Sequence, residues 1–216
     1  MRAIIAVLFG GGLGILLSAG VAALTPGTSG LLPTAVLWSG MAVAVVCALV
    51  AQRAPGLFQL RFADVVWGLG AAALLRLLGG SVSNAGVAPF PTANGTTVSL
   101  SSWVIQEGLP AGLIGPVVEE LFFRAVLVVV LYRLLSPRVG HGIAGVAAVL
   151  VSAGGFVLLH AAFAPLQASD SVQLFALGAV CAVLVITTGR VWGALLLHVT
   201  YNASFLLLAV VGSLLA

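Results

Sequence analysis

The chain has 216 residues, of which 62% are hydrophobic and only 6% are charged, and its mean hydropathy is +1.27. These values exclude a soluble globular protein and predict a multi-pass integral membrane protein surrounded by lipid. The formal net charge of +3 comes from eight basic residues, all arginines, most of which flank apolar runs. Nucleic acid is therefore not an expected partner.

Seven apolar runs are long enough to cross a bilayer, and we predict an all-α bundle of about seven spans. The runs cover Ala3–Leu24, Leu31–Ala51, Phe62–Leu78, Leu109–Leu135, Gly142–Ala162, Val172–Thr188 and Val191–Leu215. The first is longer than a usual signal-peptide core, so we expect it to be retained as a membrane anchor. The fourth exceeds one crossing, and Pro110 and Pro116 leave room for a short re-entrant entry.

The arginines alternate between the predicted connections. Those of the inward connections are Arg2, Arg53, Arg61, Arg133, Arg138 and Arg190, whereas the connections Thr25–Gly30, Ser81–Ser102 and Ala164–Asp170 contain no arginine. Because basic residues in short loops tend to stay in the cytoplasm, this pattern predicts an inward N-terminus and an outward C-terminus.

Two adjacent acids and an arginine interrupt the fourth run, in the segment V-V-E-E-L-F-F-R-A-V-L. An ionisable side chain near the bilayer centre costs roughly 2.5–3.5 kcal/mol on insertion scales, so such a cluster indicates a functional site. Glu120 and Arg124 are four residues apart and can pair on one helix face. Glu119 points to another side, without an arginine, and is the better candidate for exchanging protons. The alternative is that both acids only tie helices together.

Two further polar segments lie in later runs. His160 ends the segment F-V-L-L-H, and His198 and Asn202 are four residues apart in H-V-T-Y-N. An imidazole can carry a proton near neutral pH, and a histidine and an amide on one helix face can donate to an oxyanion. Taken singly, each of these residues is equally consistent with helix packing.

Nearly all strongly polar side chains deep in the apolar runs belong to these three segments, which makes coincidence a weak explanation. Together they provide a base for water, a proton carrier and hydrogen-bond donors, so we infer peptide-bond hydrolysis by activated water. The remaining charges, Arg76, Asp64, Glu107 and Asp170, are interpreted as flanking or packing charges. Cys47 and Cys181 are interpreted as small buried hydrophobic residues.

The segments E-E-L-F-F-R, F-V-L-L-H and H-V-T-Y-N, in this order, resemble the motifs of the CAAX protease and bacteriocin-processing family, which includes the type II CAAX prenyl endopeptidases. The resemblance divides the chain into membrane helices over residues 1–103, a catalytic helical core over 104–208 and the end of the last helix over 209–216. It implies an intramembrane endopeptidase of a bacterial-type cell membrane, acting on a membrane-associated, possibly prenylated, peptide or protein.

By motif position, the resemblance implies that Glu119 and His160 polarise the attacking water and that Glu120 and Arg124 support this arrangement. His198 and Asn202 would stabilise the oxyanion. Zn²⁺ is a possible cofactor of such a donor set, but no H-E-x-x-H helix is present, and we favour a metal-free mechanism. The alternatives are a non-catalytic bacteriocin-immunity or scaffold protein of the same fold and a proton-coupled transporter.

One inference disagrees with the resemblance. The arginine pattern places Glu119 and His160 toward the outer half of the membrane, whereas prenylated CAAX substrates reach the membrane from the cytosol. The substrate therefore stays open at this stage.

Overall fold

The computed structural model describes residues 2–24, 31–51, 54–82, 86, 90–92 and 100–215, and within these ranges all regular structure is helical. The helices are α1 (Arg2–Leu24), α2 (Leu31–Ala51), α3 (Phe62–Val82), α4 (Leu100–Trp103), η1 (Val104–Gly108), η2 (Pro110–Ile114), α5 (Gly115–Glu120), η3 (Leu121–Val128), α6 (Val129–Ala161), α7 (Ala168–Thr188) and α8 (Trp192–Leu215), where η marks π-helical stretches. The expected all-α class is confirmed.

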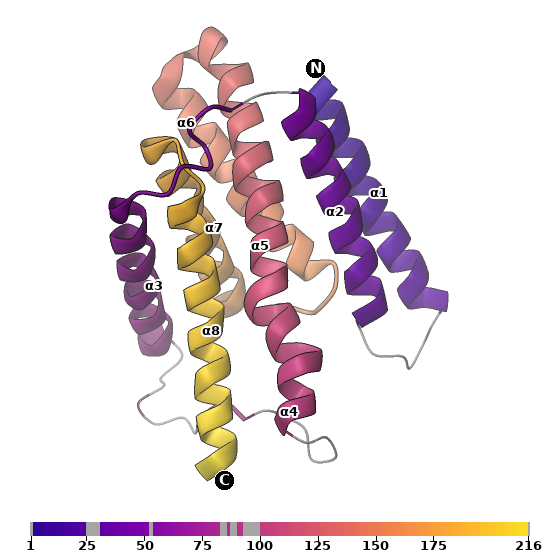
Figure 1. Cartoon of the computed structure of the whole chain (residues 1–216), viewed down its shortest axis with the longest axis vertical. Coiled ribbons are helices and arrows are strands. Elements are labelled where there is room, and N and C mark those ends of the chain that lie inside the picture. The colour runs from indigo at the N-terminus through magenta and orange to yellow at the C-terminus, as the bar shows by residue number, and fades with distance from the viewer. Residues whose placement is uncertain are drawn as a thin grey trace.

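The described helices pass back and forth between two ends of the bundle, and the two termini lie at opposite ends (Figure 1). Five of them are long and apolar enough to span a membrane, and one of the five, Val104–Ala161, runs for 58 residues and turns back within α6. The 23-residue α1 packs along α2, and its apolar part Gly11–Leu24 is shorter than those five helices. The protein is an integral membrane bundle, as predicted, and the described residues contain five candidate spanning helices where about seven spans were expected.

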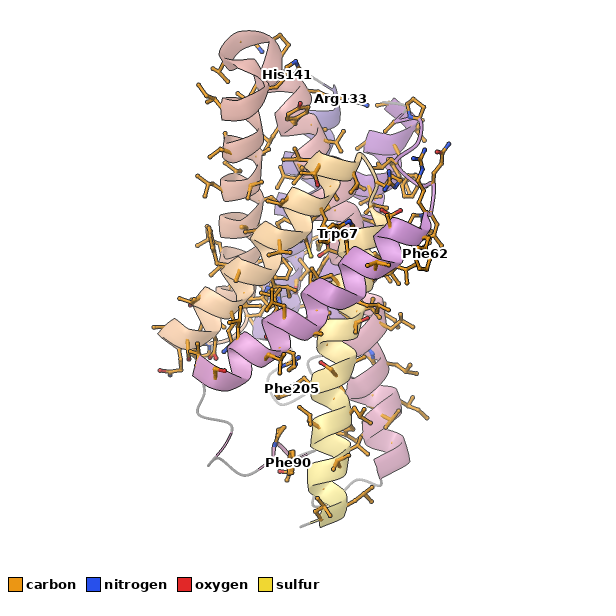
Figure 2. All side chains as sticks on the ribbon, turned by 90° about the vertical axis from the view of Figure 1, so that its left-hand side faces the viewer. Phe62, Trp67, Phe90, Arg133, His141 and Phe205 are labelled. Carbon is orange, nitrogen blue, oxygen red and sulfur yellow. The ribbon has the colours of Figure 1, made fainter. Side chains whose placement is uncertain are left out.

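The turn within α6 lies at Gly140, whose backbone adopts φ 80° and ψ 163°. A side chain is strained at this φ, so glycine suits the position where the helical path reverses. Arg133 and His141 lie close to this reversal, at one end of the bundle (Figure 2). The second half of α6 then leads back to His160, which places that histidine far along the returning helix.

The segment from Leu100 to Val128 forms one continuous helical path, and the re-entrant entry expected near Pro110 is wrong. Pro110 and Pro116 lie inside this path, and each lacks the backbone N–H that would donate a helical hydrogen bond. The local adjustment is made by π-helical turns, which recur at functional sites in helices. One of these stretches, η3, follows the two adjacent glutamates directly.

A buried ion pair fastens α3 to the α7–α8 connection. Asp64, fully buried in the first turn of α3, accepts hydrogen bonds from Arg190 Nε at 2.8 and 3.1 Å and from the backbone N–H of Arg61 at 2.8 Å. The hydrogen bond to Asp64 raises the pKa of the Arg190 guanidinium, so this cation stays charged. The packing role predicted for Asp64 agrees with this geometry.

The connections on which the orientation prediction rests are described only in part. Arg53, the connection Thr25–Gly30 and most of Ser81–Ser102 lie outside the described residues. Three of the inward arginines lie in or beside the connections between helices, namely Arg61, Arg138 and Arg190. The alternating arginine pattern assigns these connections to one side of the membrane. Cys181 is buried, as expected, whereas Cys47 is exposed on the surface of α2 and that expectation is wrong for it.

We predict that Gly68→Ala lowers stability by about 1–3 kcal/mol, the usual cost of overpacking. A Cβ at this position would lie 2.8 Å from the Gly193 carbonyl oxygen and 2.9 Å from Leu196 Cβ, where α3 packs against α8. Gly70→Ala on the same helix is the matched control, because a Cβ at that position would have nothing within 4 Å. Unfolding titrations in mild detergent measure both variants, and an equal response of the two would contradict this account of the interface.

Candidate active site

The two glutamates end α5, and Arg124 follows one turn later in η3. Glu120 and Arg124 are fully buried, with Arg124 Nη1 3.1 Å from Glu120 Oε1. Their contact is a charge pair more than a directed hydrogen bond, because Nη1 lacks hydrogen-bond geometry toward the carboxylate. The predicted pairing of these two residues is present, and it offsets part of the cost of burying both charges.

His198 of α8 lies between the two adjacent glutamates. Its Nδ1 is 2.8 Å from Glu120 Oε1, a hydrogen bond, and its Nε2 is 3.9 Å from Glu119 Oε2. The second distance exceeds that of a direct hydrogen bond, so this nitrogen faces Glu119 without a direct hydrogen bond to it. Glu119 is the less buried of the acids, with 13% of its side chain exposed.

Phe156 forms an aromatic wall on which the charged cluster rests. The Arg124 guanidinium carbon lies 4.8 Å from the centroid of this ring, within cation–π range. The ring also meets His198 edge-on, at 5.5 Å between centroids and 81° between planes. On α7, Gly178 leaves space for the guanidinium, since a Cβ there would lie 3.2 Å from Arg124 Nη2. The arginine is thus packed by apolar groups on several sides.

His160 also packs on Phe156, with 4.5 Å between the two ring centroids. Its Nδ1 bonds to the Phe156 carbonyl oxygen at 2.9 Å, one turn back on α6. This bond fixes the ring and leaves Nε2 as the nitrogen available for a further contact. Among the described residues, no direct polar contact joins His160 to Glu119.

Asn202 lies one turn beyond His198 on α8, as the spacing predicts. Its Nδ2 donates to the Ala111 carbonyl oxygen of η2 at 2.9 Å, which ties the two helices together. An amide nitrogen carries two N–H groups, so one donor remains for a second acceptor. Asn202 thus approaches the site from the η2 side, while Glu119, Glu120, Arg124 and His198 form its centre.

Residues 101–204 match the model of the family described as type II CAAX prenyl endopeptidase Rce1-like. The chain carries an Rce1-like domain. All six candidate residues, Glu119, Glu120, Arg124, His160, His198 and Asn202, lie within the matched segment. Comparisons with curated proteins and with solved structures gave no match. The matched segment covers the helices that bring the candidate residues together, and it leaves out α1 to α3.

The Rce1-like domain uses residues to which sequence reasoning gave no role. Phe156 begins the segment F-V-L-L-H, but the sequence analysis gave it no function. Its position four residues before His160 places both side chains on one helix face. Cys181 was interpreted as a packing residue, and its buried thiol in addition contacts the Ala194 carbonyl oxygen of α8 at 3.6 Å. Gly178 could not be singled out from the sequence, because the chain contains many glycines and the contact that requires this one is with Arg124 on another helix.

The donor set of the Rce1-like domain does not suit a zinc ion in the arrangement observed. The described residues contain no group of three or more His, Cys, Asp or Glu side chains placed to share a metal. Glu120 Oε1 contacts both Arg124 and His198 Nδ1, and that arginine would repel a divalent cation. His160 and His198 both pack on the Phe156 ring, and among the described residues no polar contact joins the two imidazoles.

We therefore expect that a chelator does not change the activity of the purified protein, and that metal analysis finds far less than one zinc ion per chain. The physical reason is that Arg124 occupies the position beside Glu120 that a metal would need. The measurement is elemental analysis paired with an activity assay before and after chelation. Activity that disappears on chelation and returns with Zn²⁺ alone would contradict the metal-free interpretation.

Proposed function

We propose that the Rce1-like domain is an intramembrane endopeptidase that hydrolyses a peptide bond of a membrane-associated substrate with a water molecule activated by Glu119. The observation that carries this proposal is the position of His198, whose two ring nitrogens face the two adjacent glutamates. One carboxylate holds the ring and the other remains open to a reactant. The family match supports the same class of reaction.

The two glutamates have different chemical tasks in this proposal. Glu120 is fully buried and compensated by Arg124, so it serves to fix the orientation of His198. Glu119 is partly exposed and has no arginine partner among the described residues, so it can take a proton from water as the water oxygen attacks the carbonyl carbon. It then returns this proton to the amide nitrogen as the C–N bond breaks.

The oxyanion of the tetrahedral intermediate would be held by His198 Nε2–H and the free N–H of Asn202. An imidazolium at His198 donates from Nδ1 to Glu120 and from Nε2 to the oxyanion. With Glu119, Glu120 and Arg124 ionised, this imidazolium brings the formal charge of the four side chains to zero. Such a balance makes a charged cluster tolerable at membrane depth.

His160 would position the attacking water through Nε2, because its Nδ1 is held by the backbone. No direct polar contact joins His160 to Glu119 among the described residues, so in this proposal a water molecule bridges them. In this proposal His160 orients the water oxygen and Glu119 accepts the proton.

The substrate class follows from the location of the site. A cluster inside a helical bundle can reach only peptides that lie in or on the membrane, and the family match makes a CAAX-type substrate the first hypothesis. Prenylation of that substrate stays a proposal. A library of membrane-anchored peptides, with and without a prenyl group, would identify the preferred class.

A direct test uses purified protein in lipid nanodiscs with membrane-anchored reporter peptides, and mass spectrometry to identify the fragments. We expect two fragments that together account for the substrate plus one water molecule. Protection against a bacteriocin in cells tests the non-catalytic alternative. Protection that persists in a Glu119→Gln and His198→Gln double variant would favour that alternative.

A further inference from the structure

Arginines gather at the end of the bundle where α6 reverses. Arg61, Arg138 and Arg190 lie in or beside the connections at this end, and Arg133 lies about two turns before the reversal (Figure 2). In the part of the chain that the structure describes, the acidic side chain at this end is Asp64, which already accepts two hydrogen bonds from Arg190. This end therefore carries an excess of positive charge and attracts anionic groups.

Arg133 lines a cavity of about 180 Å³ at this end. Three parts of the chain form its walls, namely the α2–α3 connection, the helical path from η3 into α6, and the end of α7. Besides Arg133, the lining residues include Leu57, Val129, Tyr132, Val185 and Ile186. The cavity is smaller than one that holds a drug-sized ligand, so it suits the head group of a larger molecule. A cation among apolar walls indicates an anion that is attached to an apolar body.

Hydrogen bonds hold the walls of this cavity in place. The Tyr132 hydroxyl lies 3.0 Å from His141 Nδ1, a hydrogen bond that joins the two arms of α6 across the reversal. On another wall, the backbone N–H of Val191 donates to the Leu57 carbonyl oxygen at 3.0 Å, which ties the α2–α3 connection to the α7–α8 connection. The cavity is thus formed before a ligand enters, and binding needs little rearrangement of the chain.

An apolar groove of about 250 Å³ adjoins the cavity, and Ile186 lines both. Its other lining residues come from the returning half of α6 and from α7, namely Gly145, Val146, Val149, Leu150, Val183 and Thr187. Val146, Leu150 and Val183 are exposed, so the groove opens toward the lipid. Because α7 runs toward this end and the returning half of α6 runs away from it, the groove leads from the charged cavity into the membrane interior.

We propose that the cavity and the groove together bind one anionic phospholipid, with its phosphate on Arg133 and an acyl chain between α6 and α7. A guanidinium pairs with a phosphate through two parallel hydrogen bonds, and basic pockets between membrane helices bind such head groups. The groove favours a lipid over a soluble phosphate, because a soluble anion leaves this apolar surface uncovered. The bound lipid bridges the α2–α3 connection, α6 and α7.

Native mass spectrometry of the protein in detergent tests the head-group part of this proposal and needs no cleavage activity. Phosphatidylglycerol and phosphatidylcholine with identical acyl chains are added in equal amounts. We expect wild-type protein to retain phosphatidylglycerol about 5-fold more than phosphatidylcholine, the contribution of one arginine beside a lipid phosphate. Arg133→Gln should move this ratio to near one. The ratio is taken within each variant, so a loss of folded protein cancels.

Arg138→Gln is the matched control. Arg138 is an exposed arginine of the same helix that donates to the Leu134 carbonyl oxygen, and it lines neither the cavity nor the groove. The preference for phosphatidylglycerol should survive in this variant. An equal loss of preference in Arg133→Gln and Arg138→Gln would indicate a general attraction to the charged end and would overturn the proposal, as would wild-type protein without a preference.

Gly145→Leu tests the acyl-chain part of the proposal. A Cβ at this position would lie 3.9 Å from Ile186 Cγ2, an ordinary contact, so the added side chain fills the groove without a clash at its base. We expect it to retain several-fold less phosphatidylglycerol. Gly142→Leu is the control, because a Cβ there has nothing within 4 Å and the residue lies outside both linings.

A competition experiment distinguishes a lipid from a soluble anion. Glycerol phosphate carries the head-group charge without acyl chains, so it should not displace phosphatidylglycerol at equal concentration. Displacement by glycerol phosphate, or unchanged lipid retention in Gly145→Leu, would identify a simple anion site and overturn the lipid assignment.

Discussion

Replacement of Glu119 by glutamine is expected to lower kcat by about 10²- to 10⁴-fold, the range that a positioned general base contributes. Glutamine has nearly the same shape and preserves the neighbourhood of His198 Nε2, but its amide cannot accept the proton of the attacking water. KM should change little, because Glu119 acts on the reacting water more than on the bound peptide. Steady-state cleavage of a membrane-anchored reporter in nanodiscs measures both constants.

Glu119→Asp is the matched control for this effect. It keeps the carboxylate and withdraws it by one methylene, so the base is present but displaced from the water it should activate. We expect a rate between those of wild type and Glu119→Gln. A Glu119→Gln protein as active as wild type would show that this carboxylate is not the base.

Arg124→Met should destabilise the folded protein by about 3–5 kcal/mol, since removal of one partner leaves a buried charge without compensation. Glu120 is fully buried and its Oε2 has no other hydrogen-bond partner, so its carboxylate depends on Arg124 for charge balance. Methionine fills much of the space between Phe156 and Gly178 without a charge. The unfolding free energy in mixed detergent micelles measures the effect.

The double variant Glu120→Gln and Arg124→Met separates charge from packing. With both charges removed, we expect it to regain most of the lost stability, as buried ion pairs replaced by neutral groups often do. Its activity should stay low, because the neutral amide no longer orients an imidazolium at His198. A double variant no more stable than Arg124→Met would show that lost packing, and not the unpaired charge of Glu120, causes the destabilisation.

The fold could be predicted from the sequence to a large extent, because hydropathy alone controls which segments enter the bilayer. The expected run Leu31–Ala51 coincides with α2, and the reversal before Gly142 appears at Gly140. The region after Pro110 could not be predicted, since the choice between a break and π-helical turns depends on packing against other helices. A proline in a sequence marks a lost hydrogen bond, and the surrounding structure decides how the chain compensates.

The candidate site was predictable where it depends on spacing within one helix. Glu120 and Arg124 pair as their separation indicates. Contacts between helices could not be predicted in the same way. The sequence analysis expected Glu119 and Glu120 to point to different sides, whereas both acids face the imidazole of His198. Arg76 was interpreted as a flanking charge because its position in α3 gives no sign of Tyr201 on another helix.

The most direct test of the central claim, that water activated by Glu119 attacks the peptide carbonyl, is a single-turnover cleavage in H₂¹⁸O. Mass spectrometry of the products and of the enzyme peptide that contains Glu119 locates the label. The account predicts one ¹⁸O atom in the new carboxylate of the product and none in the Glu119 side chain. Label in Glu119, or a new product carboxylate that contains only ¹⁶O, would show that an enzyme group attacks the substrate and would contradict the account.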